Sequence, residues 1–283
     1  MSWSNYQDML RGEYNRFLLK SLSHNEETYL NILNKGITNI LDASMDYVLL
    51  NYESLHSMDD DEEFDGEDSL FVEWFDNYQE EVLITMLLEN RSLAIRPLRK
   101  FYMGGSRIAY NELGLQQSFY NTDAQALKKL EDYVGGLVES IDSEYCLGVK
   151  QCLYDNRYES PHVINEKLMG LSGNPILSNI SVDTRCLFTT KTEYARAVNT
   201  GLLQTYANYG VSEVDWVTSG FRNVCGQCLE YEANSPYTLE EIQGLLPCHP
   251  NCICSVKCRV PVNPSLQRNA MVVDLTPKRK NME

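Results

Sequence analysis

The chain contains one cysteine-rich stretch, which reads CGQC at residues 225–228 and PCHPNCIC at residues 247–254. Two cysteines separated by two residues can bind one metal ion through both thiolates, because the chain turns between them. A second group of ligands, brought back by the connecting loop, completes a tetrahedron around the same ion. The stretch therefore predicts a small module whose fold is held together by structural zinc.

The spacing also identifies the candidate ligands of this zinc ion. They are Cys225, Cys228, His249 and Cys252, with Cys254 as the alternative for the fourth place. Four protein ligands leave no coordination position for a water molecule, so a closed site of this kind supports folding rather than hydrolysis. Reduced cysteines packed as small hydrophobic side chains, or disulfides, are the alternatives to metal binding.

The number and placement of the cysteines favour a metal over these alternatives. The chain has nine cysteines, which is an odd number, and six of them lie within residues 225–258. Such crowding is more typical of metal binding than of a disulfide framework distributed along the chain.

No pattern of an enzyme site accompanies the cluster. A zinc deaminase combines a His-x-Glu with a Pro-Cys-x-x-Cys, but His249 is followed by Pro250 and Asn251. The sequence also lacks a Walker-type loop, a Gly-x-Ser-x-Gly and a His-Glu-x-x-His. We therefore expect a protein that is not an enzyme and that has no catalytic residues.

The composition is typical of a folded, acidic protein. Over 283 residues, hydrophobic side chains make up 43% and the formal net charge is −16, which allows a sizeable core. Only residues 259–283 are net basic, so broad DNA binding by the body is disfavoured because it requires Lys and Arg. No signal-peptide pattern and no run of 18 or more apolar residues occurs, so we expect neither secretion nor a membrane span.

Helical periodicity dominates residues 1–120. Apolar residues recur at three- and four-residue steps over residues 23–55, opened by a capping pattern at Ser23. The same period resumes over residues 70–88. Between the two, residues 59–68 hold eight carboxylates in ten positions, which predicts a solvated acidic loop. Residues 1–120 are thus predicted to form a helical module for portal or capsid interaction.

A second, mixed module is predicted for residues 121–258. Helices are expected near residues 123–138 and 140–154, from Pro161, and over residues 189–209, followed by a strand at residues 211–218. The predicted fold class is predominantly α-helical α+β: a helical N-terminal module, a small zinc-stapled α/β C-terminal module and an extended tail. Residues 259–283 are rich in proline and basic residues, which predicts a basic extended tail that orders only against a partner.

Several motifs of this second module occur in a characteristic order along the chain. They are TKTEYARAVNTG at residues 190–201, YGV at residues 209–211, Trp216, the Cys225-x-x-Cys228 pair and HPNCIC at residues 249–254. In this order and approximate spacing, residues 125–258 resemble the phage head morphogenesis family, the minor head proteins of the phage Mu F type. Lys191 and Ile253 depart from the family pattern, which usually has Arg at both places, but neither is a proposed ligand.

The resemblance implies a structural minor head protein of a tailed virus, associated with the portal vertex and acting in capsid assembly, genome packaging or ejection. The implied partners are the portal protein and the major capsid or scaffolding protein, with viral DNA as a further partner of the basic tail. The implied location is the virion, in the capsid interior or at the portal vertex, and the host cytoplasm during assembly. The alternative function is a zinc-knuckle DNA-binding protein that contacts the packaged genome.

Two further expectations concern particular side chains. Glu193 and Asn199, on the predicted helix of the resembled motif, are expected to cap that helix or to bridge it to the zinc module. The N-terminal module is expected to supply most of the portal or capsid contact, since aromatic residues often anchor interfaces. The aromatic group of this module comprises Phe71, Trp74, Phe75 and Tyr78. The alternative interpretation is that these residues are ordinary core side chains.

Overall fold

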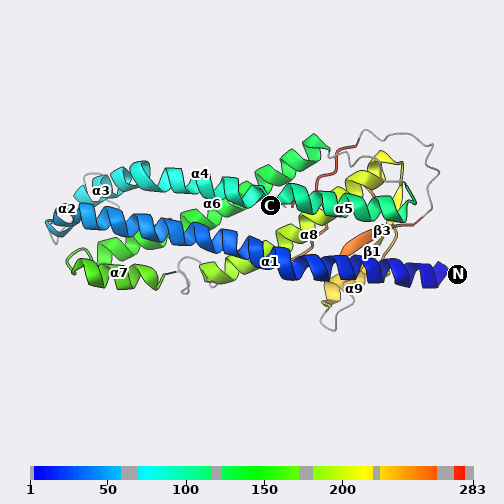
Figure 1. Ribbon diagram of the computed structural model, residues 1–283, viewed down its shortest axis with the longest axis horizontal. Coiled ribbons are helices and arrows are strands. Elements are labelled where there is room, and N and C mark those ends of the chain that lie inside the picture. The colour runs from blue at the N-terminus through cyan, green and yellow to red at the C-terminus, as the bar shows by residue number, and fades with distance from the viewer. Residues whose placement is uncertain are drawn as a thin grey trace, which may run out of the picture. The chain divides into compact units, whose positions relative to one another are not determined.

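The computed structural model is mostly helical, with a small antiparallel sheet near the C-terminal end (Figure 1). It describes residues 3–58, 69–115, 123–171, 181–218, 224–259 and 271–277, with residues 3–26 and 182–183 through their backbone alone. The helices are α1 (Trp3–Leu50), α2 (Tyr52–His56), α3 (Leu70–Tyr78), α4 (Ile84–Ile95), α5 (Leu98–Glu112), α6 (Ala124–Asp155), α7 (Pro161–Met169), α8 (Val182–Asn208) and α9 (Gly226–Ala233), with a π-helical turn at Gln79–Leu83. This confirms the predicted fold class as a helix-dominated α+β fold.

The sheet among the described residues has three strands in the order β2-β1-β3, both pairs antiparallel. The strands are β1 (Glu213–Val217), β2 (Tyr237–Thr238) and β3 (Ser255–Cys258). The register places Trp216 opposite Val256, and Val214 opposite both Tyr237 and Cys258. The strand predicted after Gly210 is therefore confirmed. Gly210 itself has a φ of 75°, the left-handed conformation that ends a helix at low cost when the residue is glycine.

The predicted helix boundaries differ from the observed ones in several places, and α8 begins at Val182 rather than near residue 189. Helix α1 begins at Trp3, so Ser23 lies inside the helix and is not its cap. The two helices expected over residues 123–138 and 140–154 are one helix, α6, because the buried side chains of Val138, Ile141 and Tyr145 keep the helical spacing across the expected break. The predicted acidic loop at residues 59–68 lies outside the described residues.

The chain forms two compact units, each assembled from separate stretches. Unit 1 contains residues 1–29, 95–134 and 188–283, and unit 2 contains residues 30–94 and 135–187. Both units include residues from either side of the boundary predicted near residue 120. The assignment of separate functions to residues 1–120, 121–258 and 259–283 stays a prediction.

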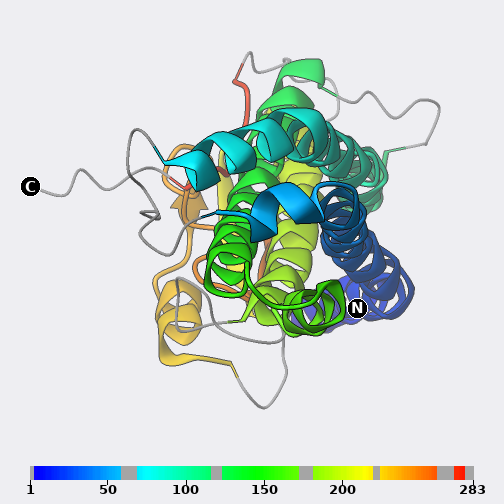
Figure 2. The ribbon, with the colours of Figure 1, turned by 90° about the vertical axis from the view of Figure 1, so that its left-hand side faces the viewer.

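Unit 2 is a bundle of helices with an aromatic core. Its parts of α1, α4 and α6 run side by side in Figure 1, and Figure 2 shows them from near their ends. Trp74 and Tyr78 both pack against Tyr47, with ring centroids 5.3 and 5.2 Å apart, and Phe71 packs against Tyr154 at 5.1 Å. All four aromatic side chains singled out in the sequence are buried. Their interpretation as ordinary core is therefore confirmed.

Unit 1 is organised around α8, which crosses α5 at very short range. The hydroxyl of Ser106 donates to the carbonyl oxygen of Gly201 at 3.1 Å. A Cβ atom added to Gly105 would lie 1.7 Å from the carbonyl oxygen of Val198. The two helices thus meet backbone to backbone, which requires glycine at the crossing.

Part of the predicted tail is also a component of unit 1. Residues 271–277 are extended and lie against the unit, with Val273 and Leu275 buried. The expectation that the tail orders only against a partner is therefore wrong for this segment, because two apolar side chains find a place within the same chain. The rest of the tail beyond Arg259 lies outside the described residues.

Among the described residues, no helix combines the length and the apolar character that a bilayer crossing requires.

Candidate metal centre

A tight turn in the Cys248–Cys252 loop creates the centre. The backbone N–H of Cys252 donates to the carbonyl oxygen of His249 at 3.1 Å, and Asn251 has a φ of 64°. Proline at the second position and a residue with positive φ at the third are the sequence requirements of a type II turn. Pro250 and Asn251 meet them, so the local sequence brings the side chains before and after the turn together.

His249 presents a defined nitrogen to the cluster. Its Nδ1 atom lies 2.7 Å from the carbonyl oxygen of Pro250, so Nδ1 carries the hydrogen and donates it. The Nε2 atom is then the acceptor, and it lies 3.3 Å from Sγ of Cys228. A hydrogen bond at one ring nitrogen fixes the tautomer and leaves the other nitrogen free to bind a metal.

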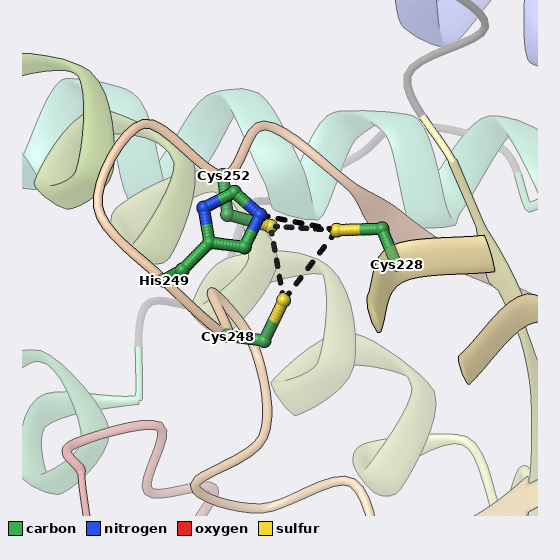
Figure 3. Close-up of side chains that lie close together, drawn as sticks. All are labelled: Cys228, Cys248, His249 and Cys252. Atoms are coloured by element: carbon green, nitrogen blue, oxygen red, sulfur yellow. Dashed lines mark hydrogen bonds between the residues drawn. The ribbon is translucent and has the colours of Figure 1, made fainter. Parts of the chain in front are cut away.

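Four side chains converge on one point from the start of α9 and from the turn (Figure 3). Cys228, Cys248, His249 and Cys252 place their ligand atoms within 4.8 Å of one another. Sγ of Cys228 lies 3.5 Å from Sγ of Cys248 and 3.9 Å from Sγ of Cys252, and the last two atoms are 3.7 Å apart. This Cys3His cluster can hold a metal ion.

Cys225 lies at the edge of the cluster. It is the N-cap of α9, where its Sγ accepts the backbone N–H of Cys228 at 3.4 Å, and the same Sγ lies 3.1 Å from Nε2 of His249. The hydrogen bond from the Cys228 backbone is the main reason why the pKa of Cys225 is lowered. A donor at a helix N-terminus stabilises a thiolate in the same way.

The thiols of the cluster differ in their tendency to ionise. Hydrogen bonds from Cys248 and Cys254 lower the pKa of Cys252 to about 2, whereas the hydrogen bond to Cys252, together with burial, raises the pKa of Cys248 above its usual range. Burial raises the pKa of Cys228 to about 12. The cluster therefore concentrates negative charge on Cys252, the most deeply placed of the thiols in the turn, and a thiolate is the form that binds metal.

The structure brings together most of the residues that the sequence predicts. Cys228, His249 and Cys252 are in the cluster, and Cys225 touches it through His249. Cys254, the alternative fourth ligand, is buried and hydrogen-bonded to Cys252 and Cys228 but is not a member of the four-residue group. Sequence reasoning missed Cys248. Its position at the other end of the Pro250–Asn251 turn is the signal that points to it.

Helix α8 holds the turn through hydrogen bonds from its side chains. The hydroxyl of Thr192 accepts the backbone N–H of Asn251 at 2.9 Å. The Asn199 side chain donates to the carbonyl oxygen of Cys254 at 3.0 Å and accepts from the hydroxyl of Ser255 at 2.7 Å. The predicted bridge from Asn199 to the cysteine module is therefore confirmed. Glu193 instead pairs with Arg196 on its own helix.

The other half of the cluster is attached to the sheet. Trp216 on β1 stacks on Tyr231 of α9, with ring centroids 4.8 Å apart. The Glu232 carboxylate, one residue further along α9, accepts from the backbone N–H and the hydroxyl of Thr218. Helix α9, which begins next to Cys225, is thus fixed on β1 while the turn is fixed on α8.

Comparison of the chain with protein-family models, curated proteins and solved structures gives no match.

Proposed function

We propose that the protein is a structural minor head protein of a tailed virus, associated with the portal vertex, in which the Cys/His cluster holds one structural zinc ion. The virion is then its place of action, and its partners are the portal protein and the major capsid or scaffolding protein. The proposal rests on the cluster, on its connection to α8 and on the motif order described above.

The donor set and its dimensions support zinc. Zn–S bonds of about 2.3 Å in a tetrahedron place the sulfur atoms about 3.8 Å apart. The three Sγ distances in the cluster run from 3.5 to 3.9 Å. Three thiols and one imidazole are also a common donor set of structural zinc sites. Cys228, Cys248, His249 and Cys252 would hold the ion, with Cys225 as a competing ligand beside His249.

Such a site serves folding rather than chemistry. Four protein ligands fill the tetrahedron, so no position remains for a water molecule that could be activated. Zinc would join the start of α9 to the 248–252 turn, two segments that are otherwise tied to different elements, β1 and α8. In a small module the binding free energy of the metal is folding free energy.

The observation that carries the proposal is the meeting of the resembled motifs in one place. Thr192 and Asn199 belong to the helical motif, whereas Asn251 and Cys254 belong to the cysteine motif, and hydrogen bonds join them across more than fifty residues of sequence. Motifs that share a structural purpose are expected to be in contact, and this contact supports treating them as parts of a single family pattern.

A co-sedimentation experiment with portal rings tests the proposal. The full chain is mixed with assembled portal rings of the virus that encodes it, and we expect the chain to sediment with the rings. Shells of the major capsid protein without a portal are the control, on which less retention is expected. Salt is varied in the same experiment, because binding to residual DNA weakens steeply with salt whereas a protein interface does not.

Mass spectrometry of purified virions provides the second measurement. The chain should be present in fewer copies than the major capsid protein. Absence from virions, together with no retention on portal rings, would contradict the proposal. Retention that disappears after nuclease treatment or in high salt would favour the DNA-binding alternative.

A further inference from the structure

The extended segment Met271–Pro277 is held along unit 1 by side chains of Lys129, Arg196, Gln204 and Gln243, and we call the strip that these four side chains form the groove. In Figure 1 the segment appears in red beside the first turns of α6. Its side chains alternate, with Val273 and Leu275 buried and Asp274 between them partly exposed. This is the period of two residues that an extended chain shows when it lies along a surface.

Side chains of α8 bind the backbone of this segment. The amide oxygen of Gln204 accepts the N–H of Val273 at 2.8 Å, and its amide nitrogen donates to the carbonyl oxygen of Met271 at 3.1 Å. The Arg196 guanidinium donates to the carbonyl oxygen of Leu275. Gln204 thus satisfies a donor and an acceptor two residues apart, as a neighbouring β-strand would.

The group that binds Leu275 is also held by contacts to other side chains of unit 1. Nε of Arg196 donates to the Glu193 carboxylate at 2.7 Å, and the guanidinium lies 4.8 Å from the centre of the Tyr133 ring. Arg196 and Glu193 are both buried. Buried charged groups with fixed geometry lose little freedom on binding, which favours affinity.

Two more contacts involve Asp274, at the centre of the segment. Nζ of Lys129 on α6 lies 3.1 Å from the Asp274 carboxylate, and the side-chain oxygen of Gln243 accepts the N–H of Asp274 at 3.3 Å. The Asp274 carboxylate also accepts from the backbone N–H and hydroxyl of Thr276. These contacts match an extended peptide in which two apolar side chains flank a carboxylate.

We propose that this groove, formed by Lys129, Arg196, Gln204 and Gln243, is a binding site for an extended peptide that residues 271–277 fill as a tethered ligand. Its occupant from outside is the same segment of a second copy of the chain. Recognition through main-chain hydrogen bonds with specificity at alternate side chains is the logic of strand addition. The segment 271–277 meets each requirement of the groove, so a second copy carries the matching ligand and can exchange strands with the first. This proposal is independent of metal binding and of the virion assignment.

A labelled peptide with the sequence of residues 270–277 represents the segment of the second copy in the test. In the full chain, Leu275→Asp places a charge at a buried position of the tethered segment and is expected to empty the groove. Fluorescence anisotropy should then show peptide binding to this variant. The unaltered chain should bind at least tenfold more weakly, because a tethered segment competes at an effective concentration on the order of millimolar.

Substitution within the groove provides the matched controls. Adding Gln204→Ala to the Leu275→Asp chain should weaken peptide binding roughly tenfold, since two main-chain hydrogen bonds are lost. Gln125→Ala, an exposed glutamine on α6, should leave it unchanged. A peptide that itself carries Leu275→Asp should not bind. A Leu275→Asp chain that keeps its helical circular dichroism but does not bind the peptide would overturn the proposal.

Hydrogen exchange of the unaltered chain decides the matter if the Leu275→Asp variant does not fold. The Val273 amide should be protected in the chain alone. Its protection should fall when the peptide is added at roughly millimolar concentration, because the peptide displaces the tethered segment. Protection that does not change as the peptide is added would also overturn the proposal.

Discussion

At the scale of single residues, His249 links the two halves of the Cys/His cluster. Its Nε2 atom lies 3.1 Å from Sγ of Cys225 and 3.3 Å from Sγ of Cys228, while its backbone belongs to the turn that carries Cys248 and Cys252. One tetrahedral ion would accept four of these five side chains. Cys225 and Cys248 would therefore compete for one coordination position.

Single serine substitutions should distinguish these two cysteines. We expect Cys228→Ser, Cys248→Ser and Cys252→Ser each to lower zinc affinity by more than the roughly 10–100-fold that is typical of a residue supporting a ligand. Cys225→Ser should stay within that range, because Cys225 is outside the group of four mutually close ligand atoms. Zinc content after competition with a chelator, expected at about one equivalent in the unaltered chain, measures the effect.

Cys258→Ser is the control for this series, since Cys258 lies on β3 and is outside the group of close ligand atoms. It should retain zinc. A larger loss in Cys225→Ser than in Cys248→Ser would show that the ligand set expected from the sequence is the right one. Zinc-free protein of unchanged stability would contradict a structural metal altogether.

Some residues of this site could be predicted from ligand spacing, and others could not. Cys228, His249 and Cys252 follow from ligand spacing alone. Cys248 does not, because the spacing rule counts pairs of ligands along the chain, whereas the Pro250–Asn251 turn brings both of its ends to the same cluster. The contacts of Thr192 and Asn199 depend on tertiary packing, which no local pattern encodes.

Asp142 is a second residue with an unusual environment. It is buried in unit 2, where Nδ2 of Asn90 donates to its carboxylate at 3.0 Å. Burial raises the pKa of Asp142 to about 6, although the hydrogen bond from Asn90 opposes the shift. Relative to the unfolded chain, the folded state therefore favours the protonated form of the Asp142 carboxyl group.

Asp142→Asn should stabilise the protein at neutral pH. Above about pH 6 the folded chain must bury a charge, whereas the uncharged Asn keeps an oxygen that accepts from Asn90; we expect a gain on the order of 2 kcal/mol at pH 7. Below about pH 4 the Asp142 carboxyl group is protonated in both the folded and the unfolded chain, so the gain should vanish there. Denaturant unfolding of both proteins at each pH measures the difference.

Asp155→Asn is the control for this comparison, because Asp155 is an exposed aspartate on the same helix. It should show little change at any pH. A gain for Asp142→Asn that does not depend on pH would argue against a buried charge as its cause.

At the scale of elements, the crossing of α5 and α8 depends on two glycines. A Cβ atom on Gly201 would lie 1.9 Å from the carbonyl oxygen of Tyr102, as close as the approach described for Gly105. The neighbouring atoms are backbone and cannot move away without shifting a helix. Phe101 and Tyr194, with ring centroids 4.6 Å apart, complete the contact.

Alanine at either glycine should therefore be strongly destabilising. We expect Gly105→Ala and Gly201→Ala each to reduce the free energy of unfolding by roughly 3 kcal/mol or more, at the upper end of overpacking effects. Gly136→Ala on α6 is the matched control, since an added Cβ there meets nothing within 4 Å. It should stabilise by about 0.5–1 kcal/mol through helix propensity. Urea midpoints compare the three, and equal effects would refute the close crossing.

The elements themselves were predictable to different degrees. Helical periodicity located α3 and α7, because one face of each is buried. It also located most of α8, although residues 193–207 of that helix are buried on every side. The same periodicity did not locate the start of α1, since a capping pattern at Ser23 is only local and the helix continues through it. The glycines at the crossing could not be distinguished from turn glycines without the partner helix.

At the scale of the whole molecule, the two compact units interleave along the chain. Helices α1, α6 and α8 each give residues to both units. A linear pattern of charge and hydrophobicity cannot reveal such an arrangement, because the contacts that define a unit join residues far apart in sequence. Fragments cut at residue 120 would therefore break both units.

This interleaving also sets an order of events during synthesis on the ribosome. All of unit 2 has been made once residue 187 has been added, whereas unit 1 still lacks residues 188 onward, including most of α8, the Cys/His cluster and the segment 271–277. At elongation rates of about 5–20 residues per second, those residues take roughly 5–20 s to appear. During that interval the early stretches of unit 1 are without their partners, and they are the part of the nascent chain that a chaperone would meet.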